Sequence, residues 1–169
     1  RYMNGRLAAL FGDLPPPSSE ADIDLDFIRD ILRHTPVIEV NPQAQHLFRA
    51  ARREEMLVPI ERFWRTRPET VRRTVLARLR GEPGYSEETR VDALDGTPID
   101  VLYTVAFPPL GLERGTNIVA FIDIGDRVAA LVKVEQMQAE LAHALDVCEA
   151  EVMSFMAPLE QVGHACCRG

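Results

Sequence analysis

Long apolar runs are missing from this sequence of 169 residues. A membrane-spanning helix needs about 20 consecutive, mostly apolar residues, and no stretch of the chain approaches that length. The apolar run from Leu7 to Phe11 is also too short for the core of a signal peptide. We therefore expect a soluble, cytoplasmic chain without a membrane segment. Because it begins at Arg1 instead of methionine, we also expect it to be part of a longer protein.

Cysteines are few, and their spacing excludes two common uses. The three present, Cys148, Cys166 and Cys167, are an odd number gathered toward the C-terminal end, which argues against a disulfide framework and fits a reducing compartment. The adjacent pair also lacks the C-x-x-C spacing typical of a metal site. We predict no metal centre, and a C-terminal tail over residues 158–169.

Basic residues do not dominate the charge. The formal net charge is -7, whereas binding to nucleic acid requires a basic surface that neutralises phosphates. Arginines do cluster between Arg62 and Arg80, but few aromatic residues lie among them, and we interpret them as solvated helix faces. Glycine-rich loops of the form G-x-G-x-x-G or G-K-[ST] are missing as well. These absences argue against nucleic acid and nucleotides as partners.

Proline and aspartate organise the N-terminal part. Residues 12–20 contain three prolines and no apolar period, which predicts a linker. Apolar residues spaced three and four apart predict a helix over residues 22–33, although the alternation in D-I-D-L-D-F also fits a strand. We favour the helix, because aspartate is unfavourable in strands and favourable in the first turn of a helix.

The stretch I-E-V-N-P-Q-A-Q-H-L-F, residues 38–48, passes directly from a strand pattern to a helix pattern. Its β-branched beginning predicts a short strand over Val37–Val40. Asn41 can cap the helix that follows, and Pro42 suits the first helical position, where its missing N–H costs nothing. Further on, broken helical fragments precede a longer helix that begins at Pro68 and stops at Gly81.

Beyond Pro83 the apolar period changes to two, which predicts strands over residues 85–93, 99–107 and 117–124. Asp95-Gly96 predicts a tight hairpin between the first two strands, because such a turn needs the positive φ that glycine adopts freely. Three consecutive antiparallel strands after a helical region define an α+β fold class.

After Asp126 the pattern is helical again and continues without a break to residue 157. Eight positions alternate between spacings of three and four, which is the pattern of a coiled-coil seam. We call these positions the seam: Leu131, Val134, Gln138, Leu141, Leu145, Cys148, Val152 and Phe155. The seam predicts a homodimer. The alternative is a long amphipathic helix that packs against its own domain.

Three segments, in this order, resemble a PAS sensory domain over residues 37–127, about half of the chain. The stretch I-E-V-N-P-Q-A-Q-H-L-F is similar to the second PAS strand and its capped helix. E-T-R-V-D-A-L-D-G-T-P-I-D-V-L-Y-T-V-A-F-P resembles the long hairpin with its D-G turn. A-F-I-D-I-G-D-R-V resembles the closing strand and the D-I-T-E-R-like signature before an exit helix. Nothing before Val37 resembles the first PAS strand, and Gly125 stands where the signature usually has threonine.

The resemblance implies a PAS-like antiparallel sheet with short helices on one face, followed by a signalling helix of a bacterial two-component sensor histidine kinase. M-Q-A-E-L-A-H-A at residues 137–144 also looks like such kinases. A phosphoacceptor histidine is typically followed by glutamate, and neither His143 nor His164 is followed by an acid. We therefore expect no catalytic residue and no enzymatic activity in this chain, with the output kinase or regulator domain elsewhere in the parent.

Cofactor signals of the family are missing, so any cofactor stays unknown. A flavin photoreceptor would carry a reactive cysteine in an N-C-R-F-like helix, and a haem sensor an axial histidine on the helix over residues 68–80; neither is present there. Trp64, Tyr103 and Phe121 are candidate ligand-binding residues between sheet and helices. The alternative is that they simply fill the core.

The expected organisation has a linker over residues 1–20, a PAS-like sensor domain over 21–126, a coiled-coil helix over 127–157 and the tail. The signal would pass from the sheet to the helix at Asp123, Asp126 and Arg127. This predicts a sensory module that dimerises and signals to a C-terminal output domain. One alternative is a ligand-free structural dimerisation domain, for example of a transcriptional regulator. Another, a small enzyme, would need converging acids or a histidine, which the sequence does not offer.

Overall fold

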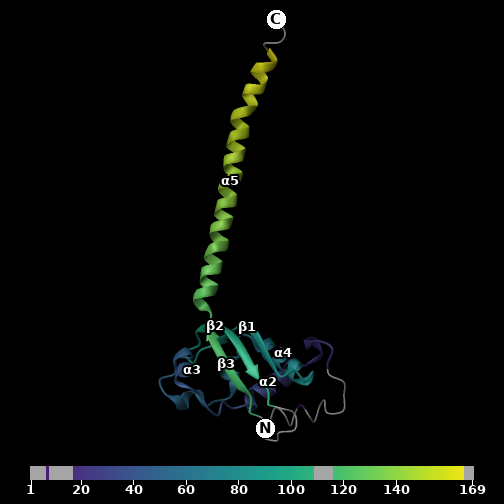
Figure 1. Ribbon diagram of the computed structural model, residues 1–169, viewed down its shortest axis with the longest axis vertical. Helices are drawn as coiled ribbons and strands as arrows, with labels where there is room; N and C mark the ends of the chain where they lie inside the picture. Colours follow the sequence, from purple (N-terminus) through teal and green to yellow (C-terminus); the bar gives the residue numbers. More distant parts are fainter. Residues whose placement is uncertain (1–6, 8–16, 109–115, 166–169) are drawn as a thin grey trace. The chain divides into compact units, whose positions relative to one another are not determined.

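A computed structural model describes residues 7, 17–108 and 116–165, with the side chains of the last helix described up to residue 150. The chain divides into two compact units, Arg1–Gly125 and Asp126–Gly169. In the described residues, the first unit combines helices with one antiparallel sheet and the second contains a single long helix, so the α+β class is confirmed (Figure 1).

The sheet consists of β1 (Gly84–Asp92), β2 (Pro98–Ala106) and β3 (Ile118–Asp123), side by side in the order β1-β2-β3 (Figure 1). Both neighbouring pairs are antiparallel, and Tyr103 at the centre of β2 lies opposite Glu87 on one side and Phe121 on the other. Gly96 in the first hairpin has a φ of 86°, so it occupies the left-handed region that such turns need. The three predicted strands and this hairpin are confirmed within one residue or so, while most of the β2–β3 connection lies outside the described residues.

The longer helices of the first unit follow the capping signals. Helix α2 (Leu25–His34) begins where the Asp24 side chain accepts a hydrogen bond from the Asp26 N–H at 3.0 Å. A 3₁₀ turn, η1 (Glu20–Asp22), precedes it. Helix α4 (Pro68–Leu79) ends before Gly81, whose φ is 77°. Most apolar residues of these helices are buried and form the core with the inward faces of the strands; the buried members include Ile28, Ile31, Leu32, Val71, Val75, Val91, Val101 and Val105.

The predicted strand Val37–Val40 was wrong. Within the described residues, this segment forms only an isolated bridge between Pro36 and Pro59, with hydrogen bonds from the Val37 N–H to the Val58 carbonyl at 3.0 Å and from the Ile60 N–H to the Thr35 carbonyl at 2.9 Å. Both bridge residues are prolines, which have no N–H to donate, so the ladder cannot extend through them.

The cap that follows was predicted correctly. Helix α3 (Pro42–Leu47) starts with the Asn41 side chain accepting from the Ala44 N–H at 2.8 Å, and Phe48 beyond its end is buried. Two further 3₁₀ turns, η2 (Arg53–Met56) and η3 (Ile60–Phe63), form the broken helical region before α4.

The second unit is described by the single helix α5 (Gly125–Ala165), which begins at the last residue of the first unit. The long helical pattern is thus confirmed and extends further than residue 157. Among the described residues, no helix is both long and apolar enough to cross a membrane.

Candidate functional site

The three candidate ligand-binding residues come together between the sheet and η3. The rings of Trp64 and Tyr103 meet edge to face with centroids 5.1 Å apart, and the Phe121 ring lies 5.6 Å from Tyr103 and 6.4 Å from Trp64. Phe48, beyond α3, extends the cluster with centroids 5.1 Å from Phe121 and 4.9 Å from Phe63. The structure therefore brings the three predicted residues together, along with two phenylalanines that the sequence analysis did not include.

The contacts within this aromatic cluster favour core packing. Trp64 and Tyr103 are buried, and edge-to-face contacts at these distances are the stable packing geometry of aromatic rings. Burial raises the pKa of Tyr103 to about 12, and its hydroxyl oxygen accepts a 3.4 Å hydrogen bond from the Thr74 hydroxyl. The polar end of Tyr103 is thus already engaged inside the protein. Ligand binding by these three residues stays a prediction.

A polar network beside this cluster was missed by the sequence analysis. The Glu87 carboxylate on β1 accepts two hydrogen bonds from the Arg73 guanidinium, at 2.7 Å from Nε and 2.6 Å from Nη2. It also accepts from the Thr70 hydroxyl at 2.7 Å and from the Tyr85 hydroxyl. Arg73 reaches Glu20 as well, at 3.2 Å. We call these five residues the Glu87 network.

The electrostatics of the Glu87 network hold its carboxylate ionised. Burial alone would raise the pKa of Glu87, but hydrogen bonds from Arg73, Tyr85 and Thr70 outweigh burial and lower this pKa to about 2. The same contact with Glu87 raises the pKa of Arg73. Burial, followed by the hydrogen bond to Glu87, raises the pKa of Tyr85 to about 12. The network is therefore built around an ion pair between Arg73 and Glu87 in which the carboxylate stays ionised at neutral pH.

A signal for this network was present in the sequence. Tyr85, Glu87 and Thr89 occupy alternate positions of a strand whose next alternate residue, Val91, is fully buried. A glutamate on the inward face of a strand needs a cationic partner. The nearest preceding helix offers Arg73 one turn after Thr70, although sequence alone does not show which arginine faces the strand.

A buried carboxylate, that of Asp92, holds the loop that precedes α4. Asp92, at the end of β1, accepts hydrogen bonds from the main-chain N–H groups of Arg65 and Thr66 at 2.9 and 3.0 Å, and from the Thr66 hydroxyl at 2.6 Å. These donors satisfy a carboxylate that would otherwise be costly to bury. Asp92 thereby joins the strand to the loop that carries Trp64.

The candidate junction residues lie at the end of β3 and the start of α5. The Asp123 carboxylate accepts a hydrogen bond from the Gly125 N–H at 2.8 Å, and the Ile124 N–H donates to the Asp100 carbonyl at 3.0 Å. Asp126 lies in the first turn of α5, where a negative charge is favourable for the helix dipole. Gly125 has no side chain that could cap the start of α5, and the Asp123 carboxylate provides this cap instead.

Seam residues on α5 are exposed wherever their side chains are described. The exposed fractions are 56% for Leu131, 51% for Val134, 62% for Leu141 and 61% for Leu145, and Cys148 is also exposed. The side chains of Val152 and Phe155 lie outside the described set. The predicted helix is confirmed, while coiled-coil pairing stays a prediction.

Among the described residues, no group of three or more histidine, cysteine, aspartate or glutamate side chains is arranged to hold a metal ion. In comparisons with known proteins, no family model and no curated protein matches this chain. The PAS resemblance therefore rests on the motifs of the sequence.

Proposed function

We propose that this chain is a PAS-like sensory module that forms a homodimer through α5 and passes a signal to an output domain of a longer parent protein. A bacterial sensor histidine kinase is the parent that the motifs favour. Support comes from the three-stranded antiparallel sheet, the capped helix after Asn41 and the direct transition from β3 into α5.

The observation that carries the proposal is the exposed apolar seam. The unit Asp126–Gly169 offers no second described element against which α5 can bury it. Burying one leucine or valine side chain is worth about 1.5–3 kcal/mol, so four exposed seam residues provide a strong drive toward a partner. A second copy of the same helix can bury the apolar side chains at every seam position, because both helices have the same alternating spacing of three and four residues.

Sedimentation equilibrium of matched double variants tests the dimer. Leu141→Asp with Leu145→Asp places charges in the seam, and we expect a monomer at concentrations where the unmodified chain is a dimer. Val132→Asp with Val147→Asp introduces the same charges at exposed positions of α5 outside the seam, so this control should remain dimeric. If both doubles behave like the unmodified chain, the seam does not mediate association.

Cys148 reports the orientation of the two helices. In a parallel, in-register pair, each Cys148 faces its counterpart, whereas in an antiparallel pair that matches the whole seam it faces Gln138. We expect rapid disulfide cross-linking under mild oxidation in a background of Cys166→Ser and Cys167→Ser. A dimer that does not cross-link at Cys148, but does in a further variant that adds Gln138→Cys, would show antiparallel pairing and exclude signalling toward a shared C-terminal output.

The proposed signalling step is a shift between two arrangements of the seam, driven by a change in the sheet. Such a change alters the output only as far as the two arrangements differ in free energy. Asp123 is positioned for this coupling because it ends β3 and caps the start of α5. Asp123→Ala in the full-length parent should uncouple the response while the fold stays intact. An unchanged response would reject this role.

A ligand-free structural dimerisation domain is the second candidate, and the contacts within the aromatic cluster favour it. Native mass spectrometry of the freshly purified chain separates the two functions. A dimer that carries additional mass supports a ligand sensor and gives the mass of the ligand. A bare dimer excludes a ligand retained in the core and favours the structural domain, and a bare monomer contradicts both.

A further inference from the structure

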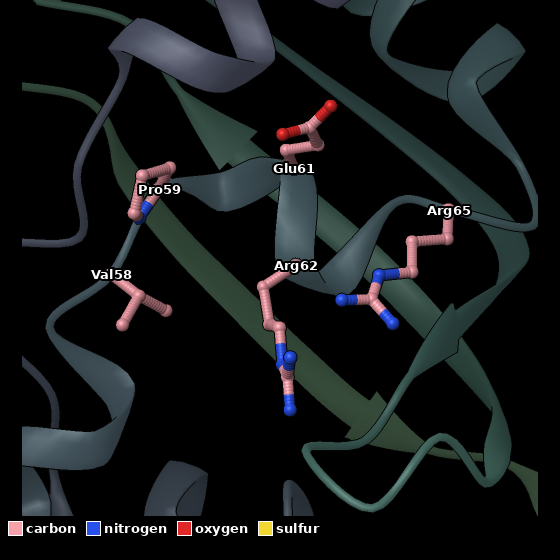
Figure 2. Close-up of a pocket in the computed structure, with 5 residues that line it drawn as sticks. All are labelled: Val58, Pro59, Glu61, Arg62 and Arg65. Atoms are coloured by element: carbon pink, nitrogen blue, oxygen red, sulfur yellow. The ribbon is translucent and has the colours of Figure 1, made fainter.

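We propose that a surface depression beside η3 binds a small oxyanion, a carboxylate or a phosphate, between the side chains of Arg62 and Arg65. The depression has a volume of about 410 Å³ and is lined by Val58, Pro59, Glu61, Arg62 and Arg65 (Figure 2). It is separate from the aromatic cluster and the Glu87 network, and the proposal does not depend on dimerisation through α5.

The acidic residue at this depression is already paired. The Glu61 carboxylate accepts a hydrogen bond from Arg33 Nε at 2.9 Å, and Figure 2 shows that it points away from the guanidinium groups of Arg62 and Arg65. The Asp92 carboxylate behind the loop is buried and accepts three hydrogen bonds from Arg65 and Thr66, none of them from a guanidinium group. The two arginines thus keep an uncompensated positive charge on a chain whose net charge is -7.

The two guanidinium groups differ in how they are held. Arg62 Nη2 donates to the Leu94 carbonyl at 2.9 Å, which anchors the side chain and leaves its other N–H groups available. Arg65 makes no side-chain hydrogen bond or ion pair with any described residue, so its full planar fork can face an anion. Planar forks of this kind bind carboxylate and phosphate oxygens in pairs.

The main chain that carries both arginines is anchored in the core. Phe63 and Trp64, between them in sequence, are buried in the core, and the main chain at Arg65 is fixed by Asp92. Site residues on a fixed main chain lose less freedom when a ligand binds. Val58 and Pro59 add an apolar wall, so an anion with an apolar part, such as an aromatic carboxylate, should bind more tightly than acetate.

Nuclear magnetic resonance titration of the full chain tests the site. Inorganic phosphate, acetate and benzoate would each be added at constant pH and ionic strength, with chloride as the reference. We expect saturable shifts at the amides of residues 58–66, with millimolar affinity, and tighter binding of benzoate than of acetate. Saturation by phosphate alone would identify phosphate monoesters as the ligand class, and saturation by the carboxylates alone would identify organic acids.

Arg65→Gln is the decisive variant, because its side chain has no described partner and its loss leaves the fold intact. We expect roughly tenfold weaker binding in Arg65→Gln and weakening in Arg65→Lys, which keeps the charge but not the fork. Arg67→Gln removes the same charge from an arginine that does not line the depression, and it should bind as the unmodified chain does. Chemical shift changes that rise linearly without saturation would overturn the proposal, because they indicate general screening by the added salt. Changes that are weakened equally in Arg65→Gln and Arg67→Gln would overturn it for the same reason.

Discussion

Replacing Glu87 by glutamine should lower the free energy of unfolding and reduce the acid sensitivity of the first unit. The pKa of the carboxyl group falls from an ordinary 4.5 to about 2 in the fold. Each unit of such a difference corresponds to 1.36 kcal/mol, which gives an upper bound of about 3 kcal/mol at neutral pH. The Glu87 side chain is 17% exposed and that of Arg73 is 36% exposed, so solvent screening reduces our expectation to about 2 kcal/mol.

The pH dependence follows from the direction of this shift. Because the folded-state pKa is lower than the unfolded-state pKa, the contribution is complete above about pH 4.5 and is lost as the pH falls toward 2. Urea titrations at several pH values between 7 and 2.5 should show the stability of the unmodified chain falling more steeply than that of Glu87→Gln. Asp95, whose pKa is also lowered to about 2 by hydrogen bonds from the main chain and side chain of Thr97 and from Arg49, titrates in both proteins. Only the difference between the two curves therefore reports on Glu87.

Glu82→Gln is the matched control, because it removes the same charge from an exposed residue shortly before β1. It should change the free energy of unfolding by less than about 0.5 kcal/mol. Equal effects of the two substitutions at pH 7, or parallel pH curves for Glu87→Gln and the unmodified chain, would refute the claim that the network stabilises the fold.

Three further substitutions test local features by urea unfolding. Asn41→Ala removes the cap of α3 and should cost about 1 kcal/mol, whereas Asn41→Asp should preserve it. Gly96→Ala should cost about 1–2 kcal/mol, because the new Cβ meets no atom within 4 Å and only the φ of 86° is strained. Asp92→Ala should cost about 3 kcal/mol, since it leaves the N–H groups of Arg65 and Thr66 without their acceptor; a loss below about 1 kcal/mol would show that water replaces the carboxylate.

Local signals were sufficient to predict most elements of the fold. The Asn41-Pro42 cap, the Asp95-Gly96 turn and the period-two strands depend on residues close together in sequence, and each is present in the structure. The strand at Val37–Val40 failed because strand formation depends on a partner far away in the chain. That partner is the segment around Pro59, where proline limits the ladder to one bridge.

At the candidate site, too, contacts between residues far apart in the sequence could not be predicted. The sequence could indicate that Trp64, Tyr103 and Phe121 lie close together, because large aromatic residues on inward positions converge in a core of this size. The Glu87 network was missed because its bonds join residues 14 and 17 positions apart, from a helix to a strand. Charge complementarity between Arg73 and Glu87 becomes visible only when the helix axis and strand register are known.

These contacts also bear on how a signal enters the module. Aromatic rings pack against one another between the sheet and η3, and the Glu87 network joins α4 to β1 with an ion pair that persists throughout the neutral pH range. A ligand that entered between the sheet and α4 would have to displace these contacts, and their full stabilising free energy would be lost. A ligand at the surface depression would instead act on the loop that contains Trp64 and Arg65. Asp92 connects this loop to β1, and the Trp64 ring connects it to Tyr103. A surface signal of this kind needs no internal cavity, so the sensory proposal does not depend on a ligand inside the aromatic cluster.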